Sequence, residues 1–266
     1  MRNKGVGKIC SVFIKQTLNE SKPSQTIVII PARYQSSRLP GKALLPIDGV
    51  PMVVKVMQQV QKSSRVQQVV VATDHPDILQ AVESFEGVAR MTSPTCECGT
   101  DRVAEVAQMY PEYDLVINVQ GDQVEFPPSV LDDLVLTLEH DSLASMATPI
   151  QSLQDEEAFN NPNVVKVVCD QDLNALYFSR SPIPYPRSSQ GPWFKHIGIY
   201  AFRREFLFQF ASWSPTPLEK SESLEQLRAL ERGKRIKCVL MTGESWDINT
   251  REDYDRYLAR KKGNGF

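Results

Sequence analysis

The sequence is poor in the features that mark several classes of protein. Its 266 residues contain no apolar run near the roughly 18 residues that a membrane span needs. Lys and Arg total 30 against 32 Asp and Glu, so the formal charge of −2 gives no support to a nucleic-acid-binding surface. With 41% hydrophobic and 23% charged residues, the composition is typical of a globular protein with neither a membrane span nor a nucleic acid as partner.

Cysteine is also scarce, and the five cysteines do not suggest a disulfide framework. Their number is odd and most lie far apart, which favours reduced thiols in a cytoplasmic protein. Cys96 and Cys98 are separated by one residue, which is too close for the usual zinc-ligand spacing, and no second Cys or His pair follows them. We expect structural thiols, with a metal site at this pair as the alternative.

Residues 1–25 differ from the rest of the chain, because five basic residues stand there against one acid. The apolar stretch at 9–14 is shorter than a signal-peptide core of about 7–15 residues, and Lys15 ends it. We expect a flexible N-terminal extension, with a targeting role as the alternative.

Strand and helix patterns alternate from residue 26 onwards. The β-branched run at 26–30, which ends at Pro31, predicts a buried strand. Further strands are expected at 69–72, 88–91 and 115–119, and helices at 50–61, 76–84, 100–109 and 129–139. Alternation at this interval predicts an α/β fold with a Rossmann-like, mostly parallel sheet that helices cover on both faces.

The pattern changes after about residue 143. Strands are expected at 164–169, 175–178 and 197–202, but the segment 181–186 is too rich in proline for a central strand. This change predicts a smaller second lobe, over about 143–240. The last expected elements are a helix at 218–232 stopped by Gly233, a strand at 236–241 and a helix at 251–261.

The loop after the first strand holds the strongest indication of chemistry. Three cations and no acid occur in the run Pro31-Ala32-Arg33-Tyr34-Gln35-Ser36-Ser37-Arg38-Leu39-Pro40-Gly41-Lys42. Open α/β sheets bind ligands at this edge, and Arg and Lys are suited to phosphate oxygens. Neither G-x-x-x-x-G-K-[ST] nor G-x-G-x-x-G is present. Composition alone also allows a solvated basic loop, but the position after a buried strand favours phosphate binding.

A carboxylate follows the strand at 115–119. Asp122 stands in Gln120-Gly121-Asp122, beside the expected phosphate loop. Mg²⁺ prefers a few carboxylates together with substrate phosphates, so Asp122 is a candidate ligand. A turn or helix-cap role is the alternative reading.

A second acidic segment precedes the last helix. Thr250 and Asp253 have the spacing of a capping box, which starts the helix. This leaves Asp247 and Asn249 on the preceding loop, where either is free to face a metal.

The second lobe carries a polar group of its own. His196 opens an expected strand, and the two-residue period places His196 and Tyr200 on one face. Glu225 and Gln226 follow in the helical segment. A lone histidine is more often structural than catalytic, but a face with His, Tyr, Glu and Gln would suit a polyhydroxylated acid.

Taken together, these segments resemble the CMP-sugar synthetases, specifically the 3-deoxy-manno-octulosonate cytidylyltransferase (CMP-Kdo synthetase) family. The resemblance runs in order over about residues 26–260. It rests on the run from Ile30 to Lys42, Val71-Ala72-Thr73-Asp74, Met91-Thr92-Ser93, Gly99-Thr100-Asp101-Arg102, Asn118-Val119-Gln120-Gly121-Asp122, Ala175-Leu176-Tyr177-Phe178-Ser179-Arg180, Lys195-His196-Ile197-Gly198-Ile199-Tyr200 and Leu224-Glu225-Gln226-Leu227-Arg228.

The resemblance implies the fold, the reaction and the site. It implies a nucleotidyltransferase-type domain over 26–262, whose second lobe binds the sugar and helps form a homodimer. It also implies a cytoplasmic enzyme of lipopolysaccharide synthesis that uses Mg²⁺ to transfer CMP from CTP to the 2-hydroxyl of Kdo, a 2-keto-3-deoxy sugar acid. The implied nucleotide-binding residues are Ala32, Arg33, Arg38, Lys42, Thr92, Ser93, Gly99, Thr100, Arg102 and Gln120. The implied catalytic residues are Arg33, Lys42, Asp122 and Asp247, with Asp122 and Asp247 as metal ligands, and the sugar-binding residues are His196, Tyr200, Glu225 and Gln226.

Two departures from the family pattern bear on these assignments. The sequence Gln123-Val124-Glu125 follows Asp122 where the family commonly has Glu-Pro. Gapless alignment puts Asn249 at the position of the second metal-binding aspartate, whereas a short shift restores Asp247, which we favour for its charge. The departures keep open another acceptor, an amino-Kdo or a sialic-type acid, and a catalytically inactive nucleotide-binding module.

Overall fold

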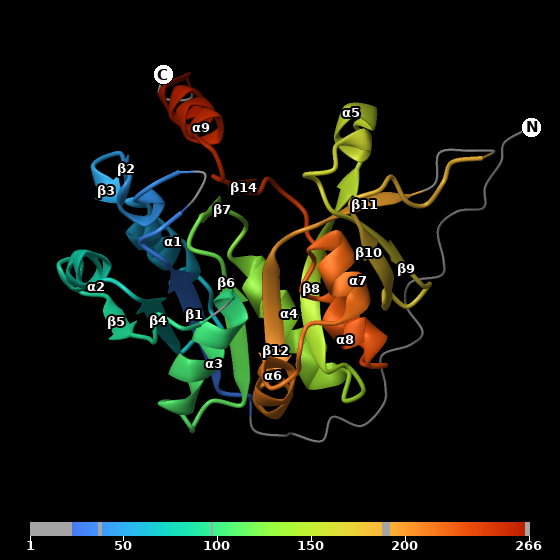
Figure 1. Ribbon diagram of the computed structural model, residues 1–266, viewed down its shortest axis with the longest axis horizontal. Coiled ribbons are helices and arrows are strands. Elements are labelled where there is room, and N and C mark those ends of the chain that lie inside the picture. The colour runs from blue at the N-terminus through green and yellow to red at the C-terminus, as the bar shows by residue number, and fades with distance from the viewer. Residues whose placement is uncertain (1–22, 37–38, 97, 188–191, 264–266) are drawn as a thin grey trace, which may run out of the picture.

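The computed structural model describes residues 23–36, 39–96, 98–187 and 192–263. Within these residues one ten-stranded sheet runs through the molecule in the order β10-β9-β11-β8-β12-β6-β1-β4-β5, with β13 beside β8 (Figure 1). Two short ribbons, β14–β7 and β2–β3, stand apart from it. The expected α/β fold is confirmed.

The elements have the following bounds. The strands are β1 Thr26–Ala32, β2 Pro46–Ile47, β3 Val50–Pro51, β4 Gln68–Thr73, β5 Val88–Met91, β6 Leu115–Val119, β7 Gln123–Glu125, β8 Met146–Leu153, β9 Lys166–Cys169, β10 Ala175–Ser179, β11 Trp193–His196, β12 Ile199–Arg203, β13 Ile236–Leu240 and β14 Trp246–Asp247. The helices are η1 Lys42–Leu44, α1 Met52–Val60, α2 Pro76–Glu83, α3 Gly99–Gln108, α4 Ser129–His140, α5 Glu156–Asn160, α6 Arg204–Ala211, α7 Pro217–Glu222, α8 Leu227–Glu231 and α9 Arg251–Gly263.

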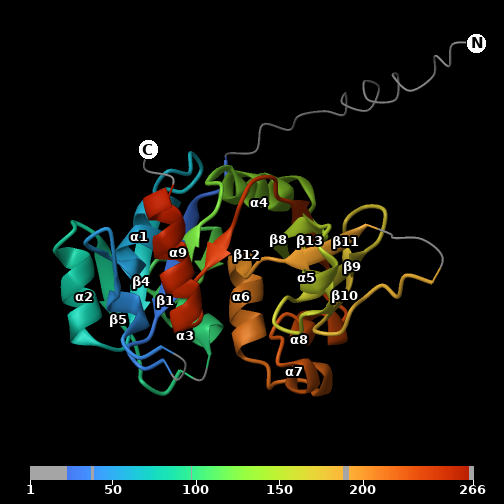
Figure 2. The same cartoon turned by 90° about the horizontal axis from the view of Figure 1, so that it is seen from above.

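Strands β6, β1, β4 and β5 form the parallel part of the sheet. Every residue of β1 is buried, and its side chains alternate between two cores. Val28 and Ile30 pack with α1 and α4, whereas Ile27 and Ile29 pack with α3 and α6. Figure 2 shows these two helical layers on opposite faces of the sheet. This covering of both faces explains why the strands read as continuous β-branched runs.

The strands of the second lobe continue the same sheet. Strands β8 to β12 pair in antiparallel fashion, and β12 joins them to β6. β13 is parallel to β8, and a bridge between Asn174 and Lys237 brings it back towards β10. The antiparallel half therefore extends the parallel half without a break.

The structure corrects several expected elements of the second lobe. The strand expected at 197–202 is β12, which begins at Ile199, and His196 ends the separate strand β11. The helix expected at 218–232 is two helices, α7 and α8, because Ser223 takes a left-handed conformation with φ 52°. Strands β8 and β11 and helix α6 were not expected.

Strand β8 escapes sequence reasoning because Pro149 lies inside it. Proline lacks an N–H and is normally excluded from central strands. Here the Pro149 carbonyl accepts a hydrogen bond from Ile197, in the short link between β11 and β12. Because the chain beside Pro149 is this link and not a regular strand, the sheet does not require an N–H donor from Pro149.

Two element boundaries differ in the first half. β1 continues through Pro31 to Ala32, beyond Ile29, the last residue that pairs with β6. α1 begins two residues later than expected, because Val50 and Pro51 form a hairpin with β2 around Asp48 and Gly49. Both turn residues have positive φ, 51° and 77°, as a two-residue hairpin turn of this kind requires.

Across the described ranges, no helix is both long and apolar enough to cross a membrane.

Candidate active site

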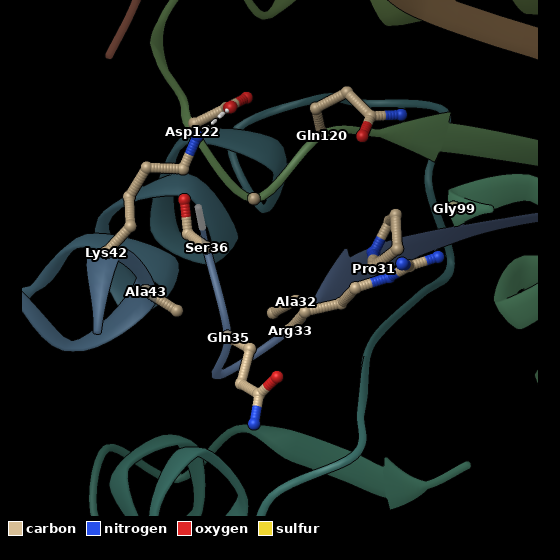
Figure 3. A pocket seen from close by; sticks show the side chains of 11 residues that line it. Pro31, Ala32, Arg33, Gln35, Ser36, Lys42, Ala43, Gly99, Gln120 and Asp122 are labelled. Atoms are coloured by element: carbon tan, nitrogen blue, oxygen red, sulfur yellow. Dashed lines mark hydrogen bonds and ion pairs between the residues drawn. The ribbon is translucent and has the colours of Figure 1, made fainter. Parts of the chain in front are cut away.

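A pocket of about 280 Å³ opens at the carboxyl ends of β1 and β6 (Figure 3). The loop after β1, the start of η1, the N-terminus of α3 and the turn after β6 form its wall. Its lining residues are Pro31, Ala32, Arg33, Gln35, Ser36, Lys42, Ala43, Gly99, Gln120, Gly121 and Asp122. Six of the predicted site residues meet here: Ala32, Arg33, Lys42, Gly99, Gln120 and Asp122.

Two cations and one carboxylate set the charge of this pocket. The Lys42 Nζ lies 2.5 Å from Asp122 Oδ2, which neutralises both groups. The Arg33 guanidinium donates to the Cys96 carbonyl at 3.1 Å. At Gly121 a Cβ atom would lie 3.0 Å from the Pro31 carbonyl oxygen, so glycine lets the two loops approach. Of the basic loop, Ser37 and Arg38 lie outside the described residues.

The Arg102 guanidinium is not among the lining residues of this pocket, and neighbouring side chains bind it. Arg102 has no exposed surface, and its Nη2 donates to Asp74 Oδ2 at 3.1 Å. Its Nη1 bonds the hydroxyl of Thr92, which is also buried and donates to the Thr73 carbonyl at 3.0 Å. Arg102 and Arg33 both line a neighbouring cavity of about 540 Å³. The Ser93 N–H donates to Glu105 Oε1 at 3.0 Å.

Asp247 lies beside Asp122 because the ribbon β7–β14 brings the two chain segments together. Asp247 pairs with Gln123, and the Ile248 N–H donates to the Asp122 carbonyl at 3.0 Å. The surrounding protein raises the pKa of Asp247, and the negative charge of Asp122 raises it further.

Asn249 has a supporting position. Its side-chain amide donates to Asp247 Oδ2, and its N–H donates to Asp253 at 3.1 Å. The predicted capping box is confirmed: Thr250 Oγ1 accepts from the Asp253 N–H at 3.1 Å, and Asp253 accepts from the Thr250 N–H at 2.9 Å. Asn249 thus holds the Asp247 carboxylate, and the next residue, Ile248, is bonded to the Asp122 backbone.

Glu125 does not join these carboxylates, because Arg260 of α9 binds it. The Arg260 Nη1 lies 3.1 Å from Glu125 Oε2, and Arg260 also pairs with Glu244. The guanidinium carbon lies 5.3 Å from the ring centre of Trp246, within cation–π range. Trp246 pairs with Glu125 in the ribbon, so these contacts tie α9 to β14, the strand that contains Asp247 (Figure 1).

The predicted sugar-side residues form one cluster, although His196 and Tyr200 belong to different strands. Their ring centres are 5.3 Å apart. The Thr148 hydroxyl donates to the Ile199 carbonyl at 2.8 Å, so it accepts from His196 Nε2 at 2.9 Å. Burial lowers the pKa of His196 to about 3, which makes it a neutral ring with Nδ1 as an acceptor.

Glu225 and Gln226 complete this cluster. The Tyr200 hydroxyl donates to Gln226 Oε1 at 3.1 Å, and the buried Gln226 Nε2 has no hydrogen-bond partner among the described residues. Glu225 accepts from the Cys98 thiol at 3.1 Å and from the Thr100 hydroxyl at 2.8 Å. Burial raises the pKa of Glu225. Because Gly99 lines the pocket, the sugar-side cluster lies directly against it.

The described cysteines are all free thiols, as expected. Cys96 donates to Glu105 at 3.1 Å, and burial raises the pKa of the Cys96 thiol to about 11. Cys98 caps α3 by accepting the Asp101 N–H at 3.4 Å. In the part of the chain that the structure describes, no group of three or more His, Cys, Asp or Glu side chains is placed to hold a metal.

Sequence reasoning missed three residues that shape the site. Asn118 is fully buried in β6 and links Gln120 to Thr100. A polar residue inside an otherwise apolar strand was the available signal. Thr148 and Cys98, which hold His196 and Glu225, gave no comparable signal because their role depends on residues distant in sequence.

The arrangement is suited to joining an anionic donor to a hydroxylated acceptor. A basic pocket at one sheet edge stands beside two carboxylates and a neutral polar cluster. Residues 27–236 match the cytidylyltransferase family, and the chain belongs to that family.

Relatives of known sequence narrow the kind of cytidylyltransferase that the chain resembles. A protein of Geotalea daltonii named 3-deoxy-manno-octulosonate cytidylyltransferase is 47% identical over 252 residues, covering 89% of this chain and 98% of its own. A protein of Synechococcus elongatus with the same name is 46% identical over 238 residues, covering 88% and 96%. The family resemblance of the motifs is confirmed.

Solved structures agree with these relatives. A CMP:2-keto-3-deoxy-manno-octonic acid synthetase, solved in complex with CTP, superposes with a TM-score of 0.86 at 39% identity, covering 90% of this chain and 99% of its own. A 4-diphosphocytidyl-2C-methyl-D-erythritol synthase from Anaerococcus prevotii has a TM-score of 0.59 at 15% identity, covering 90% and 97%, and shares the fold alone.

Proposed function

We propose that this cytidylyltransferase transfers CMP from CTP to the 2-hydroxyl of Kdo and releases pyrophosphate, in the service of lipopolysaccharide synthesis. The names of its relatives support CTP as donor and Kdo as acceptor. The observation that carries the proposal is the contact of Cys98 and Thr100 with Glu225, because it sets the sugar-side cluster against the basic pocket.

The donor is assigned to the 280 Å³ pocket. Lys42 and Arg33 face the triphosphate and neutralise its oxygens, with Arg38 as a third cation in the same loop. Ala32, Gly99 and Gln120 surround the nucleoside, and Thr92, Ser93, Thr100 and Arg102 support the wall behind it. The acceptor is assigned to His196, Tyr200, Glu225 and Gln226, whose acceptor and donor atoms match a polyhydroxylated acid.

Magnesium fits the acidic side of the pocket. Mg²⁺ is usually bound by one or two carboxylates together with waters and substrate phosphates, and Asp122 and Asp247 provide two. Burial and then the charge of Asp122 raise the pKa of Asp247, and a cation bound there would relieve the repulsion between the two carboxylates. Bound there, Mg²⁺ supplies positive charge for the α-phosphate and the attacking oxygen.

The reaction is an in-line displacement without a covalent enzyme intermediate. The 2-hydroxyl oxygen of Kdo forms a bond to the α-phosphorus, the bond from that phosphorus to the β-phosphate bridging oxygen breaks, and the hydroxyl proton passes to water. Lys42 and Arg33 stabilise the negative charge that moves onto pyrophosphate. The His196 cluster fixes the acceptor, so that positioning supplies much of the acceleration.

The test is release of pyrophosphate from CTP in the presence of Mg²⁺ and one acceptor at a time. Kdo is expected to be the active acceptor, and ATP is expected to fail as donor. Activity with an amino-Kdo or a sialic-type acid alone would change the acceptor. Binding of CTP with no pyrophosphate release from any acceptor would make the protein a nucleotide-binding module.

We also propose a homodimer in the cytoplasm. In the second lobe, β10 is an edge strand whose Leu176 is 60% exposed, and Tyr185 in the following proline-rich segment is 83% exposed. Apolar side chains on an unpaired edge favour a partner. CTP as donor and free thiols at the described cysteines support a cytoplasmic location.

A further inference from the structure

A line of hydrogen bonds leads from the pocket to Glu225. Gln120 Nε2 is 3.1 Å from Asn118 Oδ1, and Asn118 Nδ2 is 3.4 Å from Thr100 Oγ1. Thr100 Oγ1 is 2.8 Å from Glu225 Oε2. Asn118 and Thr100 are 0% and 1% exposed, so water does not compete for this line.

The chemistry of its last member fixes the direction of every bond. The Thr100 hydroxyl donates its single proton to Glu225 Oε2. The Thr100 oxygen must then accept, and Asn118 presents its NH₂ group to it. The side-chain oxygen of Asn118 then accepts a hydrogen bond from the Gln120 amide, which uses one of its two N–H groups. All three donors therefore face the same way, towards Glu225.

The direction of these bonds determines which atom of Gln120 is available to a ligand in the pocket. With its amide nitrogen turned to Asn118, Gln120 presents Oε1 as an acceptor for a ligand hydroxyl or amino group. A ligand that donates to this oxygen polarises the amide and strengthens the next bond, as occurs in hydrogen-bond chains with a common direction. The effect ends at Glu225 on the sugar side.

We propose that Asn118 and Thr100 are positioning residues that couple the two substrate sites, so that the nucleotide and the sugar acid bind cooperatively. The proposal deepens the proposed function and rests on its two substrates. A nucleotide that donates to Gln120 Oε1 strengthens each bond of the line in turn, so Thr100 holds the Glu225 carboxylate more firmly when the acceptor binds. Because coupling is reciprocal, the acceptor strengthens nucleotide binding by the same factor.

The experiment measures that factor by calorimetry with Mg²⁺ present. The probes are Kdo and α,β-methylene-CTP, which cannot release pyrophosphate, and each is titrated with and without saturation by the other. Wild-type protein is expected to bind each probe at least about fivefold more tightly in the presence of the other. Thr100→Val, which keeps the shape and removes the hydroxyl, should lower this factor below about twofold. Thr100→Ser should retain it.

A wild-type factor near one, or an unchanged factor in Thr100→Val, overturns the relay. If Thr100→Val does not fold, Gln120→Met interrupts the same line at its accessible end and must lower the factor likewise. Pyrophosphate release from CTP and Kdo by the wild type is measured in parallel. Release with no coupling rejects the relay alone, whereas absence of Kdo binding and of release rejects the proposed function and the relay together.

Discussion

The ammonium of Lys42 and the carboxylate of Asp122 lie 2.5 Å apart across the pocket. In this arrangement each group neutralises the other, and both are less than one-fifth exposed. In the proposed function, an incoming triphosphate offers Lys42 a new partner and leaves Asp122 to bind a cation. Under the proposed function, the pair thus keeps these two side chains neutralised until the nucleotide and its metal bind together.

Removal of the lysine charge should therefore affect chemistry. We expect Lys42→Ala to lower turnover by a factor of roughly 10²–10³, the loss seen when a group that meets developing negative charge is removed. Steady-state pyrophosphate release is the measurement. Lys55→Ala, which removes a surface lysine 3.9 Å from Asp48, is the matched control. Turnover of Lys42→Ala within twofold of wild type would refute the role.

The two candidate metal ligands of the last loop should differ. We expect Asp247→Asn to raise the Mg²⁺ concentration needed for half-maximal activity and to lower turnover, because an amide oxygen binds Mg²⁺ less well than a carboxylate. Asn249→Ala should do less, since Asn249 acts through its bond to Asp247. The measurement is a Mg²⁺ titration at saturating CTP.

The opposite order of effects would make Asn249 the ligand. If neither variant changes the Mg²⁺ dependence, the metal is held by Asp122 and the substrates alone.

His196 should make the stability of the fold depend on pH. Its pKa is lowered from 6.5 to about 3 by burial, so the unfolded chain takes up a proton that the folded chain excludes. The stability is fully present above pH 6.5 and is lost as the pH falls towards 3, by up to about 1.4 kcal/mol per pH unit for this one group. Urea unfolding between pH 7 and 5 measures it. His196→Gln should lower the slope of the unfolding free energy against pH by the uptake of one proton. An unchanged slope would contradict the assignment of this pH dependence to His196.

The contact between Arg260 and Glu125 should stabilise α9 and, through β14, the position of Asp247. We expect Arg260→Gln to lower the free energy of unfolding by about 1 kcal/mol, through loss of the ion pair and of the Trp246 contact. It should also raise the Mg²⁺ requirement. Arg251→Gln is the matched control on the same helix, because Arg251 pairs with Asp255 at the exposed surface.

A double-mutant cycle separates the ion pair from other effects of the arginine. The double variant Glu125→Gln, Arg260→Gln should lose less free energy of unfolding than the sum of the losses in the two single variants. Strict additivity would show that the pair contributes nothing.

The second lobe should form a dimer. Light scattering is expected to give about twice the 30.0 kDa chain mass. A stable dimer needs roughly 1,000 Å² or more of buried surface, which the exposed edge at Leu176 and the segment around Tyr185 are placed to supply. Leu176→Lys and Tyr185→Ser should shift the protein towards monomer, while Leu143→Lys, at a residue 69% exposed elsewhere, should not. A monomer at all concentrations would reject the proposal.

Local patterns predicted the first half of the fold well. β1 and β6 are runs of buried apolar residues, and α2 begins with Pro76 directly after its cap, His75. Such patterns are visible in a few neighbouring residues. The second lobe was harder, because Pro149 in β8 and the left-handed Ser223 between α7 and α8 depend on chain segments far away.

The same limit applies to the site. The basic loop and Asp122 follow strands, so their meeting at one sheet edge was predictable. Thr100 and Glu225 are 125 residues apart, and no local pattern in either segment predicts the hydrogen bond between them. The position of Asp247 likewise depends on the register of β14 on β7, which sets Asp247 opposite Gln123.

Helix α9, at the end of the described chain, packs against the N-terminal half of the fold, and this has a consequence for synthesis on the ribosome. The Tyr254 hydroxyl donates to the Pro46 carbonyl at 2.5 Å, and Asp247 reaches Asp122 only through β14. A nascent chain that has emerged as far as β13 already contains the basic loop and the sheet, yet lacks one of the two carboxylates. Folding from the N-terminus can therefore build much of the core early, while the proposed pair of Asp122 and Asp247 waits until β14 has been translated.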